Sequence, residues 1–381
     1  MRRAGRSLGR VRLPWKGGRL VKIRLLELLR CPDCAHERLE LAVFASGGDR
    51  VSVHQGELRC SGCGARLPII AGIPRLLPAA LRPYLATLHP EFFAQHPELV
   101  PPAGTAADQV VARTLLGFSF QHVRLADPAP ERDRWRQNLL ESIPVGPEFF
   151  RGRLGADVGC GAGRHAWWAH EFGAEVVALD LSAGVDVAQA TLADCPRAHV
   201  VQGDIYHLPL RLRSLDFALS LGVVHHLPDP ATGIARIAAS LRPGGRLVVW
   251  VYGLEGMRWW YRLSHLTPLR PVTRPLPRRA QHALSVAIAA ALELTLWAPA
   301  RAASRLPGGA RLAARLPLSD ASRRPFVAKV RSVFDRVHPP VSHYPTAEEL
   351  AGWLRRARLT DVAVRHRDGR GWIGTGRALA A

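Results

Sequence analysis

Cysteines, acidic residues and long apolar runs are all scarce in this sequence, and each shortage excludes a class of protein. Six cysteines among 381 residues are too few for a secreted disulfide scaffold. The apolar stretch Ala283–Ala298 has 16 residues, whereas a helix that spans a bilayer needs about 20. The basic N-terminus is followed by Leu20–Glu27, which charges interrupt, so no signal peptide is expected and the cytoplasm is the predicted compartment.

The shortage of acids leaves 52 Lys and Arg residues against 31 Asp and Glu residues, a net charge of +21. The excess is local, because residues 1–30 contribute +9 and residues 255–345 contribute +11, whereas residues 151–254 hold 9 charges of each sign. We therefore expect residues 1–20 to form a basic flexible tail. The charge alone is a weak indication of a nucleic-acid or anionic-lipid partner, since the middle of the chain is electrically balanced.

Two common nucleotide-binding motifs are missing from the glycine-rich stretch Ala156–Arg164. It reads Ala-Asp-Val-Gly-Cys-Gly-Ala-Gly-Arg, so Arg164 stands where the dinucleotide fingerprint needs its third glycine, and no Gly-Lys-Ser/Thr of a P-loop follows. A strand, a glycine loop and a helix in this order leave free backbone N–H groups at the positive end of the helix dipole. The stretch therefore predicts a site for a carboxylate or phosphate that lies directly on the backbone.

The same stretch resembles motif I, D-x-G-C-G-x-G, of the class I methyltransferases that use S-adenosylmethionine (SAM), and residues 151–254 resemble the type 11-like core of that family. The resemblance implies that the loop holds the methionine half of SAM. It also implies that Asp180, which follows Asp157 by 23 positions, accepts the ribose hydroxyls and that Asp204 faces the adenine. The cofactor-binding residues expected on this basis are Asp157, Gly159, Cys160, Gly161, Gly163, Asp180, Leu181, Asp204, Ile205, Leu221 and Gly222.

Four of the six cysteines form two C-x-x-C pairs that are separated by 25 residues. This spacing is typical of a tetrahedral four-thiolate site for a structural Zn²⁺ ion, and a closed shell of this kind leaves no position for zinc chemistry. Leu25–Cys34 and Leu67–Pro78 resemble the small zinc-ribbon family of methyltransferase-activating partner proteins, whose members bind and stabilise a methyltransferase subunit. The predicted metal ligands are Cys31, Cys34, Cys60 and Cys63.

Apolar segments alternate with helical patterns on both sides of the glycine loop, which indicates a parallel sheet with its ligands at the carboxyl ends of the strands. Val362–Val364 and Trp372–Gly374 are expected to close this sheet as a hairpin. The predicted fold is therefore an α/β, Rossmann-like, seven-stranded methyltransferase sheet with an N-terminal zinc ribbon and a helical insertion after the fifth strand. The predicted domains are a tail (1–20), the ribbon (21–80), a helical linker or cap (81–150), the SAM-binding core (151–254), the insertion or acceptor lid (255–345), and a closing helix and hairpin (346–381).

The insertion holds the apolar stretch Ala283–Ala298, in which Glu293 is the only charged residue. We expect this stretch to be a buried lid helix, and an interfacial helix flanked by arginines is the second interpretation. Upstream of the core, Gly117–Gln121 resembles the aromatic segment that packs over SAM in many such methyltransferases, although an ordinary core contact fits it equally well. Asp335–Pro340, with His343 and Tyr344, is a second candidate patch at the end of the insertion.

The fourth predicted strand ends without an Asp/Asn-Pro-Pro-Tyr motif, which disfavours methylation of exocyclic amino groups of adenine or cytosine. It is followed instead by His225 and His226, the two candidate catalytic residues. An imidazole beside the transferred methyl group could take a proton from a phenol or an enol, and a purely structural hydrogen bond is the other interpretation.

Three functions are compatible with these features. The first is a SAM-dependent methyltransferase for a small or lipophilic acceptor, which the neutral core and the apolar lid favour. The second is an RNA (rRNA or tRNA) methyltransferase that uses the zinc ribbon and the basic tail. The third is a non-catalytic scaffold that binds SAM and zinc, against which the intact loop and both acidic residues argue. Contact with a nucleic acid or, peripherally, with a membrane stays open.

Overall fold

We describe a computed structural model of the chain. The described residues are 21–46, 52–101, 109–125, 132–257, 259, 262, 270–307, 309, 311, 318, 321–367 and 371–379. The predicted tail, residues 1–20, and the tip of the predicted closing hairpin, residues 368–370, lie outside them.

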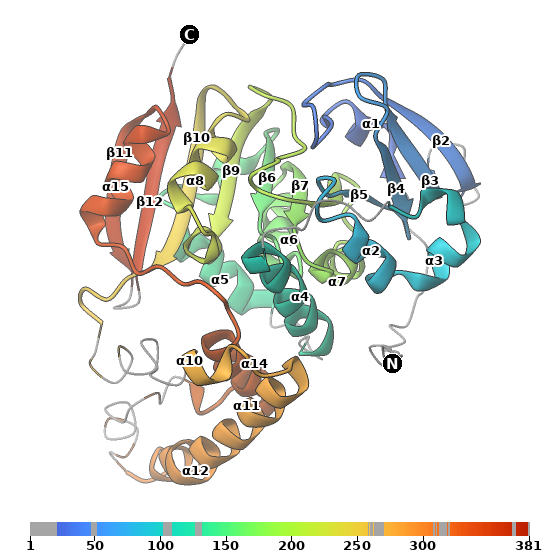
Figure 1. Cartoon of the computed structure of the whole chain (residues 1–381). Coiled ribbons are helices and arrows are strands. Elements are labelled where there is room, and N and C mark those ends of the chain that lie inside the picture. The colour runs from blue at the N-terminus through green and yellow to red at the C-terminus, as the bar shows by residue number, and fades with distance from the viewer. Residues whose placement is uncertain are drawn as a thin grey trace.

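The centre of the molecule is a sheet of five parallel strands, β6 (Leu154–Val158), β7 (Glu175–Asp180), β8 (Ala198–Gly203), β9 (Leu215–Leu221) and β10 (Leu241–Tyr252). These strands are largely buried and rich in valine, leucine and alanine, as expected for a sheet that is covered on both faces. Strand β12 (Gly371–Ala378) pairs antiparallel with β10, and β11 (Leu359–Arg367) pairs with β12. The resulting order, β8-β7-β6-β9-β10-β12-β11, confirms the predicted Rossmann-like α/β sheet (Figure 1).

Two helical layers cover this sheet. On one face, α8 (Pro230–Ala238) and α15 (Ala347–Arg356) pack their apolar sides onto the strands, and on the other face α5 (Arg132–Ser142), α6 (Arg164–Glu171) and α7 (Gly184–Thr191) do so. A capping box starts α15, because the Thr346 Oγ1 atom accepts from the Glu349 N–H and the Glu349 carboxylate accepts from the Thr346 N–H. Helix α4 (Gln109–Arg124) lies over the carboxyl ends of the strands (Figure 1).

The N-terminal ribbon consists of β1 (Val21–Lys22), α1 (Ile23–Leu26), β2 (Leu39–Ser46), β3 (Ser52–Cys60), β4 (Arg66–Ile70) and β5 (Ile73–Leu76). Its last strand pairs in parallel with β8, so that the ribbon and the core form one continuous sheet of 12 strands. The sequence predicted a separate ribbon domain beside a seven-stranded sheet and did not predict this pairing. The physical reason for the pairing is that β8 would otherwise leave a row of unpaired backbone groups at the edge of the sheet.

An ion pair between a buried arginine and a partly buried aspartate joins the ribbon to the core. The Arg75 side chain, on β5, is fully buried and donates to the Asp186 carboxylate on α7 at 2.6 Å. It also donates to the Gln202 Oε1 atom on β8 at 3.0 Å. Removing one partner of such a pair leaves an uncompensated buried charge, which costs about 3–5 kcal/mol of folding free energy. The ribbon is therefore a structural part of the core.

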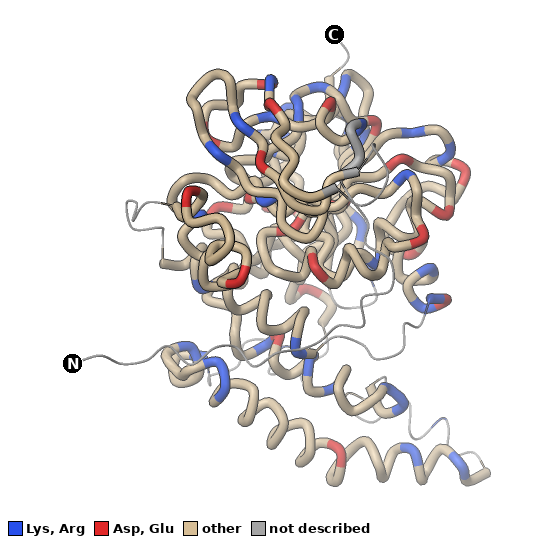
Figure 2. Tube along the Cα trace, turned by 90° about the vertical axis from the view of Figure 1, so that its right-hand side faces the viewer, with Lys and Arg blue, Asp and Glu red and all other residues tan. Residues whose placement is uncertain are grey.

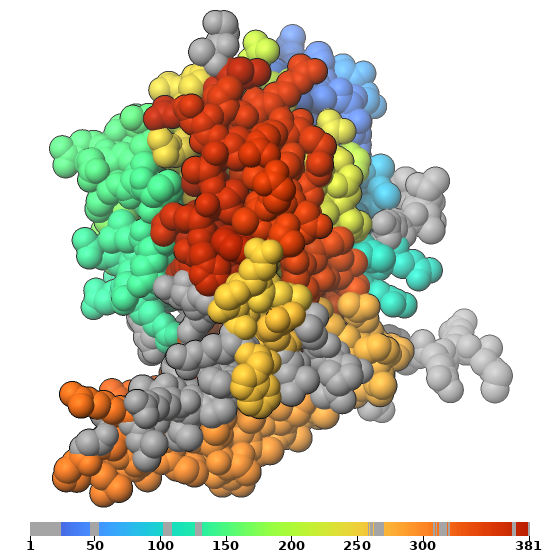
Figure 3. Space-filling view, turned by 90° about the vertical axis from the view of Figure 1, so that its left-hand side faces the viewer, coloured from blue at the N-terminus to red at the C-terminus, as the bar shows by residue number. Residues whose placement is uncertain are grey.

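Short helices connect the ribbon and the strands of the core, and the insertion is also helical. The connecting helices are α2 (Pro83–Leu88), α3 (Pro90–Gln95), η1 (Pro97–Leu99), η2 (Pro147–Phe150) and η3 (Val224–His226). The insertion contains α10 (Arg270–Thr273), α11 (Arg278–Leu292), the π-helical turn η4 (Glu293–Trp297), α12 (Ala298–Ala303) and α14 (Phe326–Val337). It projects from the end of the molecule where α4 lies, and α11 and α12 form its outer edge (Figures 1 and 3).

The expectation that Ala283–Ala298 forms a buried lid helix is wrong. This stretch belongs to one helix, Arg278–Ala303, of which only 22% of the most apolar part is buried, and Leu294 is 75% exposed. Helix α14 takes the inner position instead, because Val330, Val333, Phe334 and Val337 recur on one of its faces at the spacing of an amphipathic helix. By length and composition, Arg278–Ala303 is the one helix among the described residues that could cross a membrane.

Candidate functional site

A cavity of about 400 Å³ opens at the carboxyl ends of β6, β7, β8 and β9. Its size is within the range of ligand pockets, about 300–1,000 Å³. In open parallel sheets, ligands bind at the point where the order of the strands reverses. The strands β7 and β8 lie on one side of β6, and β9 and β10 lie on the other, so this point is at the end of β6. The insertion forms the far side of the cavity with one face of α14.

The glycine loop forms the floor of the cavity. Gly159 and Gly161 have backbone φ angles of +84° and +52°, which favour glycine. A Cβ atom at Gly159 would lie 2.4 Å from the Val223 side chain, and one at Gly161 would lie 2.7 Å from the His122 ring. Gly163, with φ of +79°, ends the loop and α6 begins at the next residue. The loop therefore presents backbone rather than side chains to a ligand, as the carboxylate site requires.

Both predicted acidic residues lie at this floor. The Asp180 Oδ2 atom accepts from the Gly161 N–H at 2.8 Å, and its Oδ1 atom accepts from the Ser182 N–H and hydroxyl at 2.8 and 2.6 Å. The Asp204 carboxylate is only 4% exposed and lies 2.7 Å from the His207 Nδ1 atom. The structure brings together nine of the predicted cofactor-binding residues on the cavity wall: Gly159, Cys160, Gly161, Asp180, Leu181, Asp204, Ile205, Leu221 and Gly222.

Asp157 and Gly163 are the two predicted cofactor-binding residues that do not line the cavity. Asp157 is 1% exposed and lies beneath the loop, where its Oδ2 atom accepts from the Ala166 N–H in the first turn of α6 at 3.1 Å. Burial raises the pKa of this carboxyl group to about 7, against the effect of that hydrogen bond, and the negative charge of Asp180 adds to the rise. The structure thus gives Asp157 a place in fixing the loop to the helix.

The opposite end of the cavity is built from core and insertion together. The Asp335 carboxylate, on α14, accepts from the Gln121 side-chain amide at 3.2 Å and from the Tyr252 hydroxyl at 3.3 Å. The other end of the Gln121 amide accepts from the His338 Nε2 atom at 2.7 Å. Burial alone would raise the pKa of Asp335, but His226, His338 and the Gln121 hydrogen bond outweigh it and hold that pKa below its usual value. Asp335 is therefore a carboxylate at neutral pH.

Of the two candidate catalytic histidines, His226 lines this end of the cavity. The Val341 carbonyl lies 3.0 Å from its Nδ1 atom and can only accept, so Nδ1 carries the hydrogen and the basic lone pair is on Nε2. Burial lowers the pKa of His226, and the nearby Asp335 carboxylate opposes this. His225 is fully buried behind it, with its ring 4.6 Å from the Tyr252 ring, and does not line the cavity. The structure thus places only one of the two where an acceptor could reach it.

Sequence reasoning missed several cavity-lining residues. It singled out Gly117–Gln121 and the patch at Asp335, and Phe118, Gln121 and Asp335 do line the cavity. It missed other residues that face the cavity from three helices. Residues three or four positions apart lie on the same face of a helix, and this spacing could have indicated them. The missed residues on these helices are Thr114, Leu115 and His122 on α4, Arg134, Trp135 and Asn138 on α5, and Ala328, Arg331 and Ser332 on α14.

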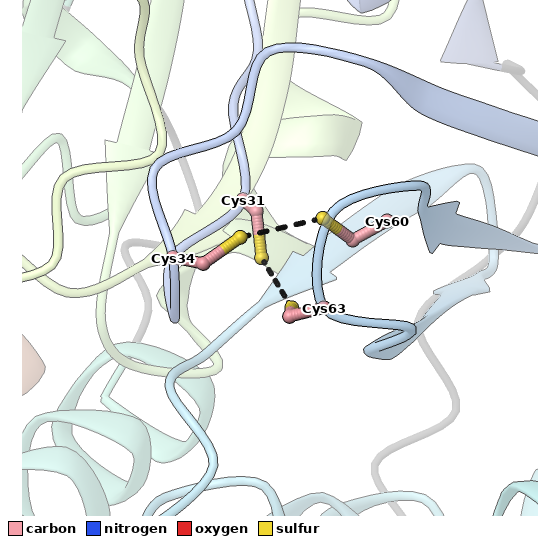
Figure 4. Close-up of side chains that lie close together, drawn as sticks. All are labelled: Cys31, Cys34, Cys60 and Cys63. Carbon is pink, nitrogen blue, oxygen red and sulfur yellow. Dashed lines mark hydrogen bonds between the residues drawn. The ribbon is translucent and has the colours of Figure 1, made fainter.

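The four predicted metal ligands meet in the ribbon. One pair lies in the loop that follows α1, and the other lies in the turn at the end of β3 (Figure 4). All four sulfur atoms are within 4.8 Å of one another, with Sγ–Sγ distances of 3.7 Å for Cys31–Cys63 and 3.5 Å for Cys34–Cys60. A Zn–S bond of about 2.3 Å gives a tetrahedron with edges of about 3.8 Å, so the cluster fits a structural Zn²⁺ ion.

We expect the double variant Cys31→Ser with Cys34→Ser to lose one zinc ion per chain and to melt at a lower temperature, because metal binding supplies part of the folding free energy. Elemental analysis of the purified protein and a thermal melt measure both effects. Cys195→Ser, at a buried cysteine outside the cluster, is the matched control and should keep its zinc. A wild-type protein that is stable and free of metal would contradict the assignment.

Comparisons with known proteins find two families that match separate parts of the chain. The sequence pattern of the family described as "Methyltransferase domain" matches residues 156–249, and that of the "Trm112p-like protein" family matches residues 22–72. The first match contains the glycine loop and the strands that carry Asp180 and Asp204. The second contains all four cysteines of the cluster.

Relatives are similar over part of the chain. An uncharacterized protein of Synechococcus is 32% identical over 43% of this chain and 40% of its own length. A tRNA U34 carboxymethyltransferase of Hahella chejuensis is 36% identical over 26% of this chain and 32% of its own length. The match thus spans 40% or less of these relatives. Among solved structures, a complex of the Haloferax volcanii Trm112 methyltransferase activator with a methyltransferase has a TM-score of 0.41 and 15% identity, over 70% of this chain and 98% of that one.

The glycine loop, the two carboxylates at neighbouring strand ends and the four-cysteine ribbon coincide with these two family matches. The predictions of a class I methyltransferase core and of SAM as its cofactor are therefore confirmed at the level of the domain, and the cysteine cluster is compatible with the predicted structural zinc ion. The chain contains a SAM-dependent methyltransferase domain, preceded by a Trm112p-like zinc-ribbon domain.

Proposed function

We propose that the protein transfers a methyl group from SAM to a nucleophilic atom of an RNA. The observation that carries this proposal is the single cavity that joins the glycine loop with Asp180 and Asp204 at one end to His226 and Asp335 at the other. A ligand on the loop and an acceptor beside His226 would then lie in the same cavity. The cytoplasmic location stays a prediction.

The chain's own residues fit the cofactor. The loop offers backbone N–H groups at the start of α6 for a carboxylate, and Asp180 and Asp204 offer oxygens for hydroxyl and amino groups. When bound there, SAM supplies a methyl group on a positively charged sulfur that a nucleophile can displace. Holding the acceptor in the same cavity, in line with this group, is the main contribution that a protein makes to such a transfer.

On the acceptor side we assign His226 as the group that accepts a proton. Its Nε2 atom carries the lone pair, its ring is held by the Val341 carbonyl, and its lowered pKa keeps it neutral near pH 7. The Asp335 carboxylate would stabilise the imidazolium that forms when the proton arrives. Asp335 thus acts as a positioning and electrostatic group, held ready by Gln121 and Tyr252.

The basic and aromatic residues that line the cavity support the proposal of an RNA acceptor. Arg134, Arg164, Arg324 and Arg331 line the cavity, and arginine is the side chain best suited to phosphate groups. The wall also contains Phe118, Trp135, Trp250 and Tyr252, which offer faces on which an unstacked base can lie. Relatives of the methyltransferase domain are named tRNA U34 carboxymethyltransferase, and the ribbon belongs to the Trm112p-like family.

A small lipophilic acceptor is the second candidate. The same aromatic wall favours it, and so does the exposed apolar helix Arg278–Ala303, which packs on the back of α14. The two candidates give different roles to the arginines that line the cavity. An RNA acceptor would bring phosphate groups to them, whereas a lipophilic acceptor carries no row of phosphates.

Incubation with methyl-labelled SAM and separate RNA, lipid and metabolite fractions distinguishes these acceptors. We expect label in the RNA fraction, with a rate that falls steeply as the salt concentration rises. The double reversal Arg324→Glu with Arg331→Glu should raise KM for RNA at least about tenfold, because each lost phosphate contact weakens binding. Arg355→Glu, on the exposed side of α15, is the matched control. Label in the lipid fraction alone would overturn the RNA proposal in favour of the second candidate.

Binding of the cofactor is tested separately by calorimetry. Asp180→Ala should weaken SAM binding by about 10- to 100-fold, because a hydrogen bond to a charged group contributes about 1.5–3 kcal/mol and the loop amide of Gly161 also loses its partner. Asp194→Ala, at an exposed carboxylate outside the cavity, should bind SAM as the wild type does. Unchanged affinity in folded Asp180→Ala would remove the proposed cofactor site.

The role of His226 predicts a pH profile. A base with a lowered pKa loses its proton-accepting form only as the pH falls through that pKa. We therefore expect kcat to be flat around neutral pH and to fall only at a pH lower than the ordinary histidine pKa of about 6.5. His226→Gln should lower kcat at least about 100-fold and leave the SAM affinity intact. His366→Gln, on the exposed strand β11, controls for the loss of a histidine. A His226→Gln enzyme with the wild-type kcat and profile would exclude this role.

A further inference from the structure

The helix Arg278–Ala303 buries two polar residues in its first half and exposes many apolar residues along its length. Gln281 and Ser285 are buried, with the Gln281 side-chain amide donating to the Thr273 carbonyl at 2.9 Å and the Ser285 hydroxyl donating to the Gln281 carbonyl at 2.7 Å. A surface helix normally buries its apolar side and exposes its polar side. The exposed uncharged positions of the helix, which we call the outer face, are Ala280, Ala283, Ala287, Ala291, Leu294, Thr295, Pro299 and Ala302.

The outer face is wider than these small residues, because larger apolar side chains flank it. Leu284, Ile288, Leu292 and Leu296 are half-buried along its length. Next to its two ends, Val272 and Leu306 are each 66% exposed. At about 1.5 Å per residue, the helix presents this surface over roughly 39 Å. An apolar surface of this length is more than the scattered single residues that soluble proteins expose.

Charges are placed around the outer face in a defined way. Arg274 and Arg279 are exposed at its beginning and Arg305 at its end, and Figure 2 shows basic residues towards both ends of this helix with one acidic position between them. Glu293 is the only acidic residue between positions 270 and 307. Its carboxylate lies 2.6 Å from the buried Lys329 Nζ atom and also contacts Arg301, and these cations lower its pKa. The one negative charge of the helix is thus turned inward and neutralised.

We propose that the outer face docks on the surface of an anionic lipid bilayer, with the helix lying in the plane of the interface. The apolar side chains would enter the boundary of the acyl chains, and Arg274, Arg279 and Arg305 would reach the phosphates of the lipid headgroups. The net charge of +11 over residues 255–345 adds attraction to a negatively charged surface.

Other occupants of the outer face fit the observations less well. An RNA would need cations along the face, where the chain has alanine and leucine. A second copy in antiparallel packing would bring Arg279 next to the partner's Arg305, so that like charges repel. A helix that crossed the bilayer would leave α14 and carry Gln281 and Ser285 into hydrocarbon.

Docking of this face would act on the cavity through one helix. Val330 and Phe334 of α14 share an apolar cluster with Ala289 and Trp297 of the outer helix, while Arg331 and Asp335 of the same α14 line the cavity. A bilayer held against the outer face therefore lies one helix away from the acceptor end of the site. The docking itself needs neither cofactor nor acceptor, so a failed test of the proposed function would not contradict it, and the reverse also holds.

Flotation of the full-length, zinc-loaded protein with vesicles tests the proposal. We expect the protein to float with phosphatidylcholine vesicles that contain about a third phosphatidylglycerol and to bind pure phosphatidylcholine at least tenfold more weakly. The double variant Ala291→Glu with Leu294→Glu should lose at least tenfold in bound fraction, because two charges enter the apolar boundary. Leu212→Glu is the matched control and should float as the wild type does, because this leucine is 48% exposed on the methyltransferase domain, away from the outer face. Circular dichroism and retained SAM binding show that each variant is folded.

Further measurements distinguish docking on a bilayer from the other candidate occupants of the outer face. Reversal of Arg274, Arg279 and Arg305 to glutamate should abolish the preference for anionic vesicles, and carbonate at high pH should release the bound wild type. Equal flotation of the wild type and of Ala291→Glu with Leu294→Glu would overturn the proposal. Retention in the vesicles after carbonate would overturn the in-plane position. A wild-type dimer that the same variant dissociates, without any binding to vesicles, would assign the face to a second copy.

Discussion

The structure depends on the convergence of neighbouring parallel strands at one edge of the sheet. Strands β6, β7, β8 and β9 all end there, so the glycine loop, Asp180 and Asp204 lie together although up to 45 positions separate them in the chain. The hydrogen bond from the Gly161 N–H to the Asp180 carboxylate joins the first two of these strand ends directly. Because this bond needs the loop to pass close to β7, the positive φ angles at Gly159 and Gly161 are part of the site.

The two additions to the core contribute in different ways. The ribbon extends the sheet at its β8 edge and is fastened through Arg75, so a zinc ion in its cysteine cluster would stabilise the same sheet that carries Asp204. The insertion instead supplies one wall of the cavity, and its Asp335 is tied to Gln121 of α4 and Tyr252 of β10. A chain without the insertion would keep the floor on which we place the cofactor and lose the acceptor end.

The sequence alone predicted the features that depend on local pattern. The loop around Gly159–Gly163, the acids that end two strands and the cysteine pairs each carry their chemistry within a few neighbouring residues. Features that depend on packing between distant segments could not be predicted in this way. The pairing of β5 with β8 and the contact between Gln121 and Asp335 join residues that are more than 100 positions apart. The apolar composition of Ala283–Ala298 indicated a helix, but whether it or α14 faces the core was decided by the stronger one-sided pattern of α14.

Hydrogen–deuterium exchange with and without S-adenosylhomocysteine tests the central claim most directly, since it locates the ligand without any substitution. Our account predicts that the ligand slows exchange of backbone amides at 159–166, 180–184 and 204–206, the three strand ends that form the floor of the cavity. Protection confined to the ribbon or to the insertion, with these three segments unchanged, would contradict it.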